Sequence, residues 1–270
     1  MTQQQRAEQF RALHQRAGAF PIPNPWDAGS ARLLEHLGFE ALATTSSGLA
    51  YAKGRLDYHV TRDEVLEHLR ALSEATKLPI SADLENGFGD DPEICADTVR
   101  LAAEAGVVGG SIEDATGDPD GPIYCIEHAV ARVRAAAEAA HSLAIPFTLT
   151  ARCENFLHGR PDLNDTIGRL QAYQEAGADV LYAPGLTSED QIRAVVSAVD
   201  RPVNVLAMRG TGIDLARMSQ LGVKRVSVGG ALCRAAAAAI VNAAREMKDT
   251  GSFAWLDAAL PPEELTAALR

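Results

Sequence analysis

One unit repeats about eight times along this chain: a short apolar run followed by an alanine-rich stretch of helical length. The stretches between the runs, such as DPEICADTVRLAAEAG (91–106), carry apolar residues at i, i+3, i+4 and i+7 and often end in Ala-Gly or Leu-Gly, as capped amphipathic helices do. The repeat therefore predicts parallel strands covered by helices. The predicted strands lie in FPIPNP (20–25), EALATTS (40–46), LPISADLE (78–85), VVGGSIED (107–114), FTLTARCE (147–154), ADVLYAPG (178–185), RPVNVLA (201–207) and KRVSVGG (224–230).

The number of units and the length of 270 residues favour an α/β fold of the (β/α)8 TIM barrel type over an open doubly wound sheet. No GxGxxG motif follows the first predicted strand, as a dinucleotide fold would require. We assign the barrel to residues 1–250 and a C-terminal helical tail to residues 251–270. The tail is expected to dock on the barrel or on a neighbouring subunit through its apolar side chains, Trp255, Leu256, Leu260 and Leu265.

Composition limits the partners of the protein. A formal net charge of -11 argues against broad binding to nucleic acid or to anionic membranes. The polar N-terminus MTQQQRAEQF and the lack of a long apolar run predict a cytoplasmic protein without a signal peptide or membrane span. The four cysteines are far apart and have no zinc-ligand spacing. A small anionic substrate would therefore depend on local arginine or metal.

The stretch SADLENGFG (81–89) places two acids directly after an apolar run. In an extended chain Asp83 and Glu85 would point to the same face, because side chains at i and i+2 do so. Adjacent carboxylates repel each other, and a divalent metal with its waters would hold both ionised.

Polar residues gather where each predicted strand ends, which in a barrel is the end that carries the active site. A single acid after a strand is often only a helix cap, but here several neighbouring strands end in acids or arginine. Asp83, Glu85 and Glu113 would form an oxygen-rich site suited to Mg²⁺. Arg152 would bind a substrate carboxylate, and Glu154 would hold Arg152 in orientation.

A competing interpretation concerns Gly229 and Gly230, which open a helix after the last predicted strand. Barrel enzymes that act on sugar phosphates often bind phosphate at such a position. Glycines there also allow close packing of strand and helix. Because no comparable pair follows the seventh strand, the sequence favours packing.

The motifs TTSSGLA, ADLENGFG, SIED, TARCENF and EAGADVLYAPG, in this order and spacing, resemble the isocitrate lyase/phosphoenolpyruvate mutase superfamily from about Pro21 to Lys248. The resemblance is to the branch of methylisocitrate lyase and carboxyphosphonoenolpyruvate mutase. It implies a (β/α)8 barrel that uses Mg²⁺, with Mn²⁺ as an alternative, to bind a 2-oxo acid or its enolate. It also implies a homo-oligomer, a dimer or tetramer, in which paired subunits exchange the last barrel helix.

The resemblance assigns roles to individual positions. Arg152, Asp57 and Glu113 would be catalytic, and Asp83 would bind the metal directly, while Glu85 and Glu113 would reach it through water. The substrate would be held by Ser47, Gly48, Leu49, Arg152 and Asn204.

The loop at residues 115–126 departs from the superfamily pattern. Lyases carry Lys-Lys-Cys-Gly or Lys-Arg-Cys-Gly there, whereas this chain has no lysine or arginine in ATGDPDGPIYCIEH (115–128). Cys125 is the only thiol in the loop, and it lacks the basic neighbours that activate a thiol, which disfavours a catalytic role. The sequence thus predicts a Mg²⁺-dependent lyase or decarboxylase that breaks a carbon-carbon bond of a small 2-oxo or 2-hydroxy di- or tricarboxylic acid through an enolate. A non-catalytic 2-oxo acid binding protein and a sugar-phosphate barrel enzyme are the alternatives.

Overall fold

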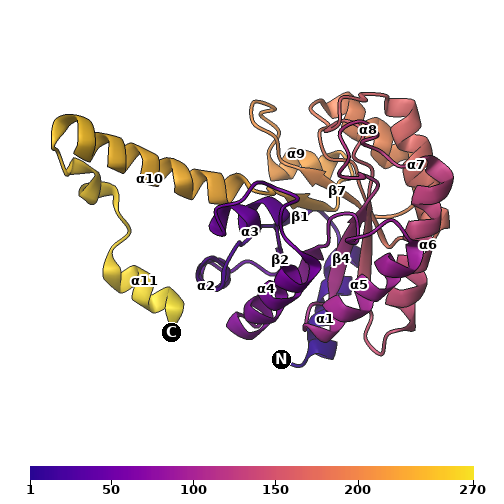
Figure 1. Ribbon diagram of the computed structural model, residues 1–270, viewed down its shortest axis with the longest axis horizontal. Coiled ribbons are helices and arrows are strands. Elements are labelled where there is room, and N and C mark those ends of the chain that lie inside the picture. Colours follow the sequence, from indigo (N-terminus) through magenta and orange to yellow (C-terminus); the bar gives the residue numbers. More distant parts are fainter.

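The computed structural model describes all 270 residues and shows eight parallel strands surrounded by helices (Figure 1). The strands are β1 Phe20–Ile22, β2 Leu42–Ala43, β3 Ile80–Asp83, β4 Gly109–Glu113, β5 Thr148–Arg152, β6 Val180–Tyr182, β7 Val203–Leu206 and β8 Arg225–Ser227. The helices are α1 Gln3–Gln15, α2 Ala28–His36, α3 Ser46–Ala52, α4 Arg62–Ala75, α5 Pro92–Glu104, α6 Ile126–Ser142, α7 Leu163–Glu175, α8 Glu189–Ala198, α9 Leu215–Gln220, α10 Ala231–Thr250, the 3-10 helix η1 Ala254–Ala258 and α11 Pro262–Leu269. Each predicted apolar run contains one strand, and the predicted (β/α)8 barrel is confirmed.

The sheet runs in the order β1-β8-β7-β6-β5-β4-β3-β2, and every neighbouring pair is parallel. Between β1 and β2 the amide of Ala43 donates to the carbonyl of Pro23 at 3.1 Å, so the barrel is nearly closed. The C-terminal ends of all strands consequently meet at one mouth.

Local sequence sets the bounds of the outer helices. Thr61 caps α4 in a capping box with Glu64. Gly106 and Gly177 follow α5 and α7 with φ of 97° and 107°, a conformation that favours glycine. The Ala-Gly endings of the repeat are therefore helix stops.

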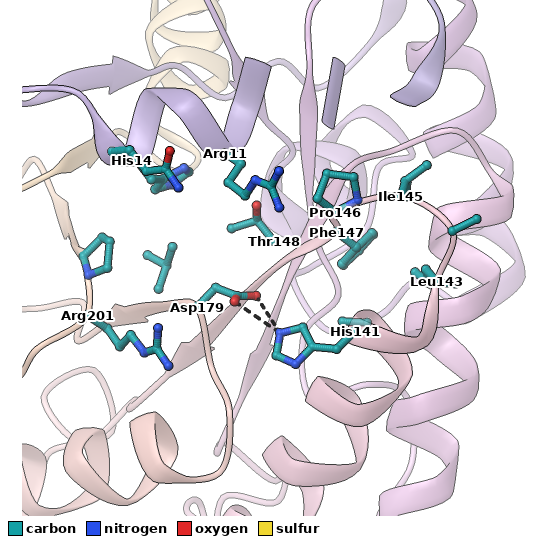
Figure 2. Close-up of a pocket in the computed structure, with 15 residues that line it drawn as sticks. Arg11, His14, His141, Leu143, Ile145, Pro146, Phe147, Thr148, Asp179 and Arg201 are labelled. Atoms are coloured by element: carbon teal, nitrogen blue, oxygen red, sulfur yellow. Dashed lines mark hydrogen bonds and ion pairs between the residues drawn. The ribbon is translucent and has the colours of Figure 1, made fainter. Parts of the chain in front are cut away.

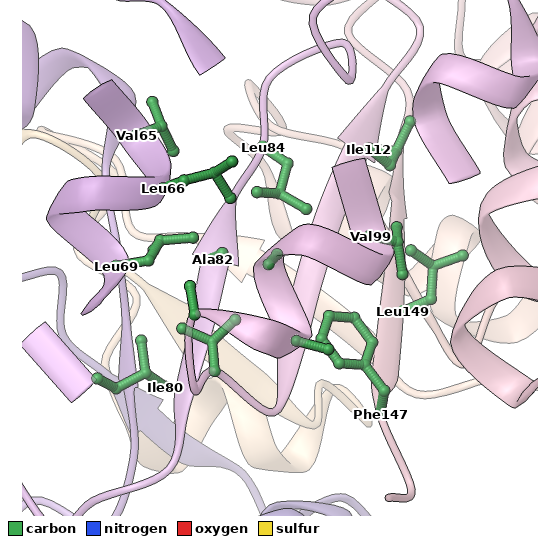
Figure 3. Close-up of a cluster of buried hydrophobic side chains, with 14 of the residues drawn as sticks. Val65, Leu66, Leu69, Ile80, Ala82, Leu84, Val99, Ile112, Phe147 and Leu149 are labelled. Atoms are coloured by element: carbon green, nitrogen blue, oxygen red, sulfur yellow. The ribbon is translucent and has the colours of Figure 1, made fainter. Parts of the chain in front are cut away.

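The largest apolar core cluster lies between β3–β5 and the helices α4–α6 (Figure 3). Leu69, Leu84, Val99 and Leu149 are fully buried there. Burying a side chain of this size contributes about 1.5–3 kcal/mol relative to leaving it exposed. This layer holds β3, β4 and β5 rigidly, and their ends carry most of the acidic side chains described below.

Helix α1, which the repeat pattern did not predict, packs at the N-terminal end of the barrel. Its Phe10 is fully buried. A Cβ atom on Gly109 of β4 would lie 2.9 Å from Phe10 Cε1, so the glycine makes room for the ring. Helix α1 thus packs tightly against the start of β4 at this end of the barrel.

Helix α10 extends away from the barrel, and α11 turns back toward α2 (Figure 1). None of the residues of α10 is buried, and Ile240 is 70% exposed. Leu256 and Leu260 of the tail are 55% and 48% exposed, so the expected docking on the barrel is limited to α11, where Arg32 Nη1 donates to the carbonyl of Leu269. Exchange of the last barrel helix stays a prediction. No helix combines the length and apolar character needed to cross a bilayer.

Candidate active site

A cavity of about 220 Å³ opens at the C-terminal ends of the strands. It is polar, and side chains that follow β2, β3, β5, β6, β7 and β8 converge on it. Of the predicted site residues it is lined by Ser47, Asp57, Asp83, Arg152 and Asn204.

Arg152, at the end of β5, is the centre of a compact charge cluster. Its Nη1 lies 2.9 Å from Asp83 Oδ1, its Nη2 lies 3.1 Å from Glu113 Oε2, and its Nε donates to Glu154 Oε1 at 2.8 Å. The side chains of Glu113 and Glu154 are each 1% exposed, and that of Arg152 is 14% exposed. The expected orientation of Arg152 by Glu154 is thus present, and the ends of β3, β4 and β5 are tied together.

The next residue after Glu113 has a different role. Asp114 points away from the mouth, where its Oδ2 accepts hydrogen bonds from Tyr173 at 2.6 Å and Arg169 at 3.2 Å. Its Oδ1 accepts the amide of Glu154 at 2.8 Å. Asp114 therefore fixes the backbone that carries the charge cluster.

Tyr58, in the segment between α3 and α4, contacts the cluster from outside the barrel strands. Its hydroxyl donates to Glu113 Oε1 at 2.5 Å. Burial, and then the charge of Glu113, raise the pKa of Tyr58, so its hydroxyl keeps its proton. This residue was not predicted from the sequence, because nothing in GRLDYHV shows that its side chain reaches an acid 55 positions along the chain.

The acids around Arg152 outnumber the single cation that neutralises them. Burial, followed by repulsion from Asp83 and Asp57, raises the pKa of Glu85 to about 8. Burial likewise raises the pKa of Glu113 and of Asp57, although Arg152 opposes the rise at Glu113 and a hydrogen bond from Ser46 opposes it at Asp57. The site thus has a deficit of positive charge.

The extended strand predicted to carry both Asp83 and Glu85 is shorter than expected. The strand β3 ends at Asp83, and Glu85 adopts a left-handed backbone with φ of 48°. The turn is closed by the amide of Gly87, which donates to the carbonyl of Leu84 at 2.8 Å. Asp83 lines the cavity, whereas Glu85 is buried beside it and its Oε1 has no hydrogen-bond partner.

In the segment after β2, two serines line the cavity, and the two residues that follow them are buried in the protein. Ser46 and Ser47 line the cavity, and the amide of Ser46 donates to Asp83 Oδ2 at 3.1 Å. Gly48 and Leu49 are buried, and their amides donate to the hydroxyl and carbonyl of Thr45. The structure thus places only Ser47 of the predicted substrate-binding triplet Ser47–Leu49 at the cavity.

Asn204 of β7 lies in a second polar group at the cavity floor. Its Nδ2 donates to Ser227 Oγ at 3.0 Å, and its Oδ1 accepts Arg225 Nε at 2.9 Å. Arg225 also donates to Thr150 Oγ1 at 3.0 Å, and it is 4% exposed. These contacts fix the side chain of Asn204 in one orientation.

The loop at residues 115–126 folds back on itself through a bridge between Ala115 and Ile123. Cys125 is exposed at the N-terminus of α6 and does not line the cavity. Its placement agrees with the argument against a catalytic thiol.

The backbone donors around the glycine pair after β8 are partly used within the protein. The amides of Val228 and Gly229 both donate to Asn24 Oδ1 at 2.9 Å. A Cβ atom on Gly230 would lie 2.6 Å from Ser47 Oγ, so this glycine allows close packing. The packing interpretation of the pair is supported.

The acidic side chains do not by themselves form a closed metal cage, since no three His, Cys, Asp or Glu side chains converge on one point. Mg²⁺ does not need such a cage, because it keeps several waters and is bound by one or two carboxylates. The partnerless Glu85 Oε1 and the excess of acids around Arg152 fit a divalent cation held by Asp83.

A larger cavity of about 560 Å³ lies at the opposite end of the barrel, where the strands begin (Figure 2). Arg11, His14 and Arg201 line it, and His141 pairs with Asp179 at 3.2 Å. It contains none of the predicted site residues.

Comparison with known proteins identifies the family. An oxaloacetate decarboxylase of Pseudomonas aeruginosa is 29% identical over 245 residues, which are 88% of this chain and 83% of that protein. The crystal structure of a candidate lyase/mutase from Burkholderia cenocepacia J2315 has a TM-score of 0.96 at 59% identity, covering 98% of this chain and 95% of that one. A phosphonopyruvate hydrolase solved with oxalate and Mg²⁺ has a TM-score of 0.87 at 25% identity, covering 99% and 95%.

The profile of the phosphoenolpyruvate phosphomutase family matches residues 10–248. The resemblance found in the sequence motifs is confirmed. The chain belongs to the phosphoenolpyruvate phosphomutase family, within the PEP mutase/isocitrate lyase superfamily of lyases and mutases.

Proposed function

We propose that the protein is a Mg²⁺-dependent lyase or decarboxylase that breaks a carbon-carbon bond of a small 2-oxo or 2-hydroxy di- or tricarboxylic acid. The observation that carries this proposal is the cluster in which Arg152 joins Asp83, Glu113 and Glu154 at the cavity. The relation to oxaloacetate decarboxylase and to a hydrolase solved with oxalate and Mg²⁺ supports the same class of substrate.

Asp83 would bind the metal, and Glu85 and Glu113 would hold its waters. When bound, Mg²⁺ would polarise the 2-oxo group and stabilise the negative charge that develops on its oxygen. Arg152 and Ser47 would position the adjacent carboxylate through charge-assisted and hydroxyl hydrogen bonds.

In decarboxylation the bond between C3 and the departing carboxylate breaks, carbon dioxide leaves, and the electron pair forms an enolate. The enolate then takes a proton at C3. Tyr58 does not line the cavity and directs its proton at Glu113 Oε1, so it would act on this step through Glu113.

Two alternatives have different consequences. A binding protein without turnover would keep the same charge cluster, and the lack of lysine and arginine in residues 115–126 is the observation that favours it. A sugar-phosphate enzyme is disfavoured, because Asn24 occupies two of the amides that phosphate would need.

We also propose a homo-oligomer, a dimer or tetramer, in which α10 packs against another subunit. The support is the exposure of Ile240, Val241 and Met247 on a helix that packs against its own core only near its start, at Leu232.

The test is proton NMR of the purified protein with Mg²⁺ and oxaloacetate, isocitrate, 2-methylisocitrate, 2,3-dimethylmalate or phosphonopyruvate, beside a chelator control. Disappearance of one carboxylic acid only with metal supports the proposal, and its products name the broken bond. If the acids bind and none is consumed, the protein is a binder; turnover that persists in chelator contradicts the metal requirement.

A further inference from the structure

Three arginines line the cavity, and only one is free of partners. Each of the nitrogens of Arg152 contacts a carboxylate within 3.1 Å. Arg225 is buried, and its nitrogens contact the neutral groups Asn204, Thr150 and His14. The side chain of Arg234 lines the cavity and has neither a hydrogen bond nor an ion pair.

Arg234 lies in the first turn of α10, directly after β8. Its Nη1 would be 3.3 Å from a Cβ atom on Gly230, and Ser47 Oγ would be 2.6 Å from the same atom. The guanidinium and the Ser47 hydroxyl thus approach one point, and Gly230 leaves that point open. A cation without a partner is a donor for an anionic group. The Ser47 hydroxyl already shares a hydrogen bond with Thr45 Oγ1 at 3.0 Å, so Arg234 is the free donor at this point.

The charges of the cavity are divided between its two sides. The cluster of acids comes from β3, β4 and the end of β5, whereas Arg234 follows β8, four strands away from β4 in the order of the barrel. In a closed ring of eight strands, β4 and β8 are opposite each other. The acidic side would repel a second negative group of the substrate, and the side of Arg234 would attract it.

We propose that Arg234 binds the second carboxylate of the substrate and makes the site selective for 2-oxo dicarboxylates over 2-oxo monocarboxylates. This inference rests on the proposed function, because the 2-oxo acid end must first occupy the side of Asp83 and Arg152. A cavity of about 220 Å³ has room for a four-carbon diacid, and its lining includes both Arg152 and Arg234. A phosphonate fits less well, since the amides of Val228 and Gly229 are already used by Asn24.

The test compares two four-carbon 2-oxo acids that differ in charge at C4. Isothermal titration in Mg²⁺ measures the affinity of 3,3-difluorooxaloacetate, an unreactive diacid probe, and of 2-oxobutyrate, which has a methyl group in place of the second carboxylate. The proteins are the wild type, Arg234→Gln, Arg234→Lys and Arg245→Gln. Arg245 is an exposed arginine of the same helix and is the matched control.

We expect Arg234→Gln to lower the affinity for the diacid by roughly 10- to 100-fold, as for a lost charge-assisted contact. The affinity for 2-oxobutyrate should stay within about twofold of the wild-type value. Arg234→Lys should recover part of the loss, and Arg245→Gln should match the wild type. Equal effects of Arg234→Gln on both acids, or no effect on either, would overturn the inference while leaving the proposed function in place. If Arg234→Gln lowers the affinity for phosphonopyruvate more than the affinity for the diacid, Arg234 would be assigned to a phosphonate instead. If the wild type binds neither acid in Mg²⁺, the proposed function itself fails.

Discussion

The hydroxyl of Tyr58 donates a 2.5 Å hydrogen bond to Glu113 Oε1 and joins the segment between α3 and α4 to the end of β4. We expect Tyr58→Phe to lower kcat about 10-fold, because the proton held beside Glu113 is lost. The unfolding free energy should fall by only about 1 kcal/mol, the net value of one hydrogen bond. Steady-state kinetics and urea unfolding check both, with Tyr51→Phe, a change at an exposed tyrosine of α3, as the control. Unchanged kcat would remove Tyr58 from the reaction.

Arg152 contacts three carboxylates through three different nitrogens, which the single ammonium of lysine does not reproduce. Arg152→Lys should therefore lower kcat/KM by about 100-fold or more, although lysine keeps the positive charge at this position. The matched control is Arg160→Lys, at an exposed arginine in the loop after β5. Equal kinetics for wild type and Arg152→Lys would mean that charge alone, without the fork geometry, suffices at this position.

His14 should make the fold sensitive to acid. It is 7% exposed, and burial, followed by the charge of Arg225, lowers its pKa to about 3. The folded pKa lies below the unfolded value of about 6.5, so its stabilising effect is complete above pH 6.5 and is lost as pH falls toward 3. Between pH 8 and pH 5 the wild type should lose about 2 kcal/mol more unfolding free energy than His14→Gln does. Urea unfolding at both pH values gives this difference, and parallel losses in the two proteins would contradict it.

Helix α10 should mediate assembly, since its apolar residues are exposed in the single chain. Light scattering coupled to size exclusion should give a multiple of 28.6 kDa for the wild type. The double variant Ile240→Glu, Val241→Glu should shift the mass toward the monomer, because both charges would be buried on association. A wild type that elutes as a monomer would rule out the exchanged helix.

The repeat predicted the eight strands and their order along the chain, because strand and helix periods are local properties of the sequence. It did not predict α1, whose polar sequence hides Phe10, Leu13 and Ala7 on one buried side. The candidate site was predicted where residues end a strand, as Asp83 and Arg152 do. The backbone conformation of Glu85 was not predicted, because a left-handed turn there ends the alternation of the strand. Tyr58 and Arg234 were missed, since neither lies at the end of a strand: Tyr58 is in the segment between α3 and α4, and Arg234 is in α10.

The central claim is a Mg²⁺-dependent 2-oxo acid site at Asp83. The most direct measurement is isothermal titration of oxalate into the wild type and into Asp83→Asn, which keeps the shape of the side chain, each with Mg²⁺ and with a chelator. We predict binding only by the wild type with Mg²⁺, and loss of that binding in Asp83→Asn. Oxalate binding that is unchanged by the chelator or by the substitution would contradict the account.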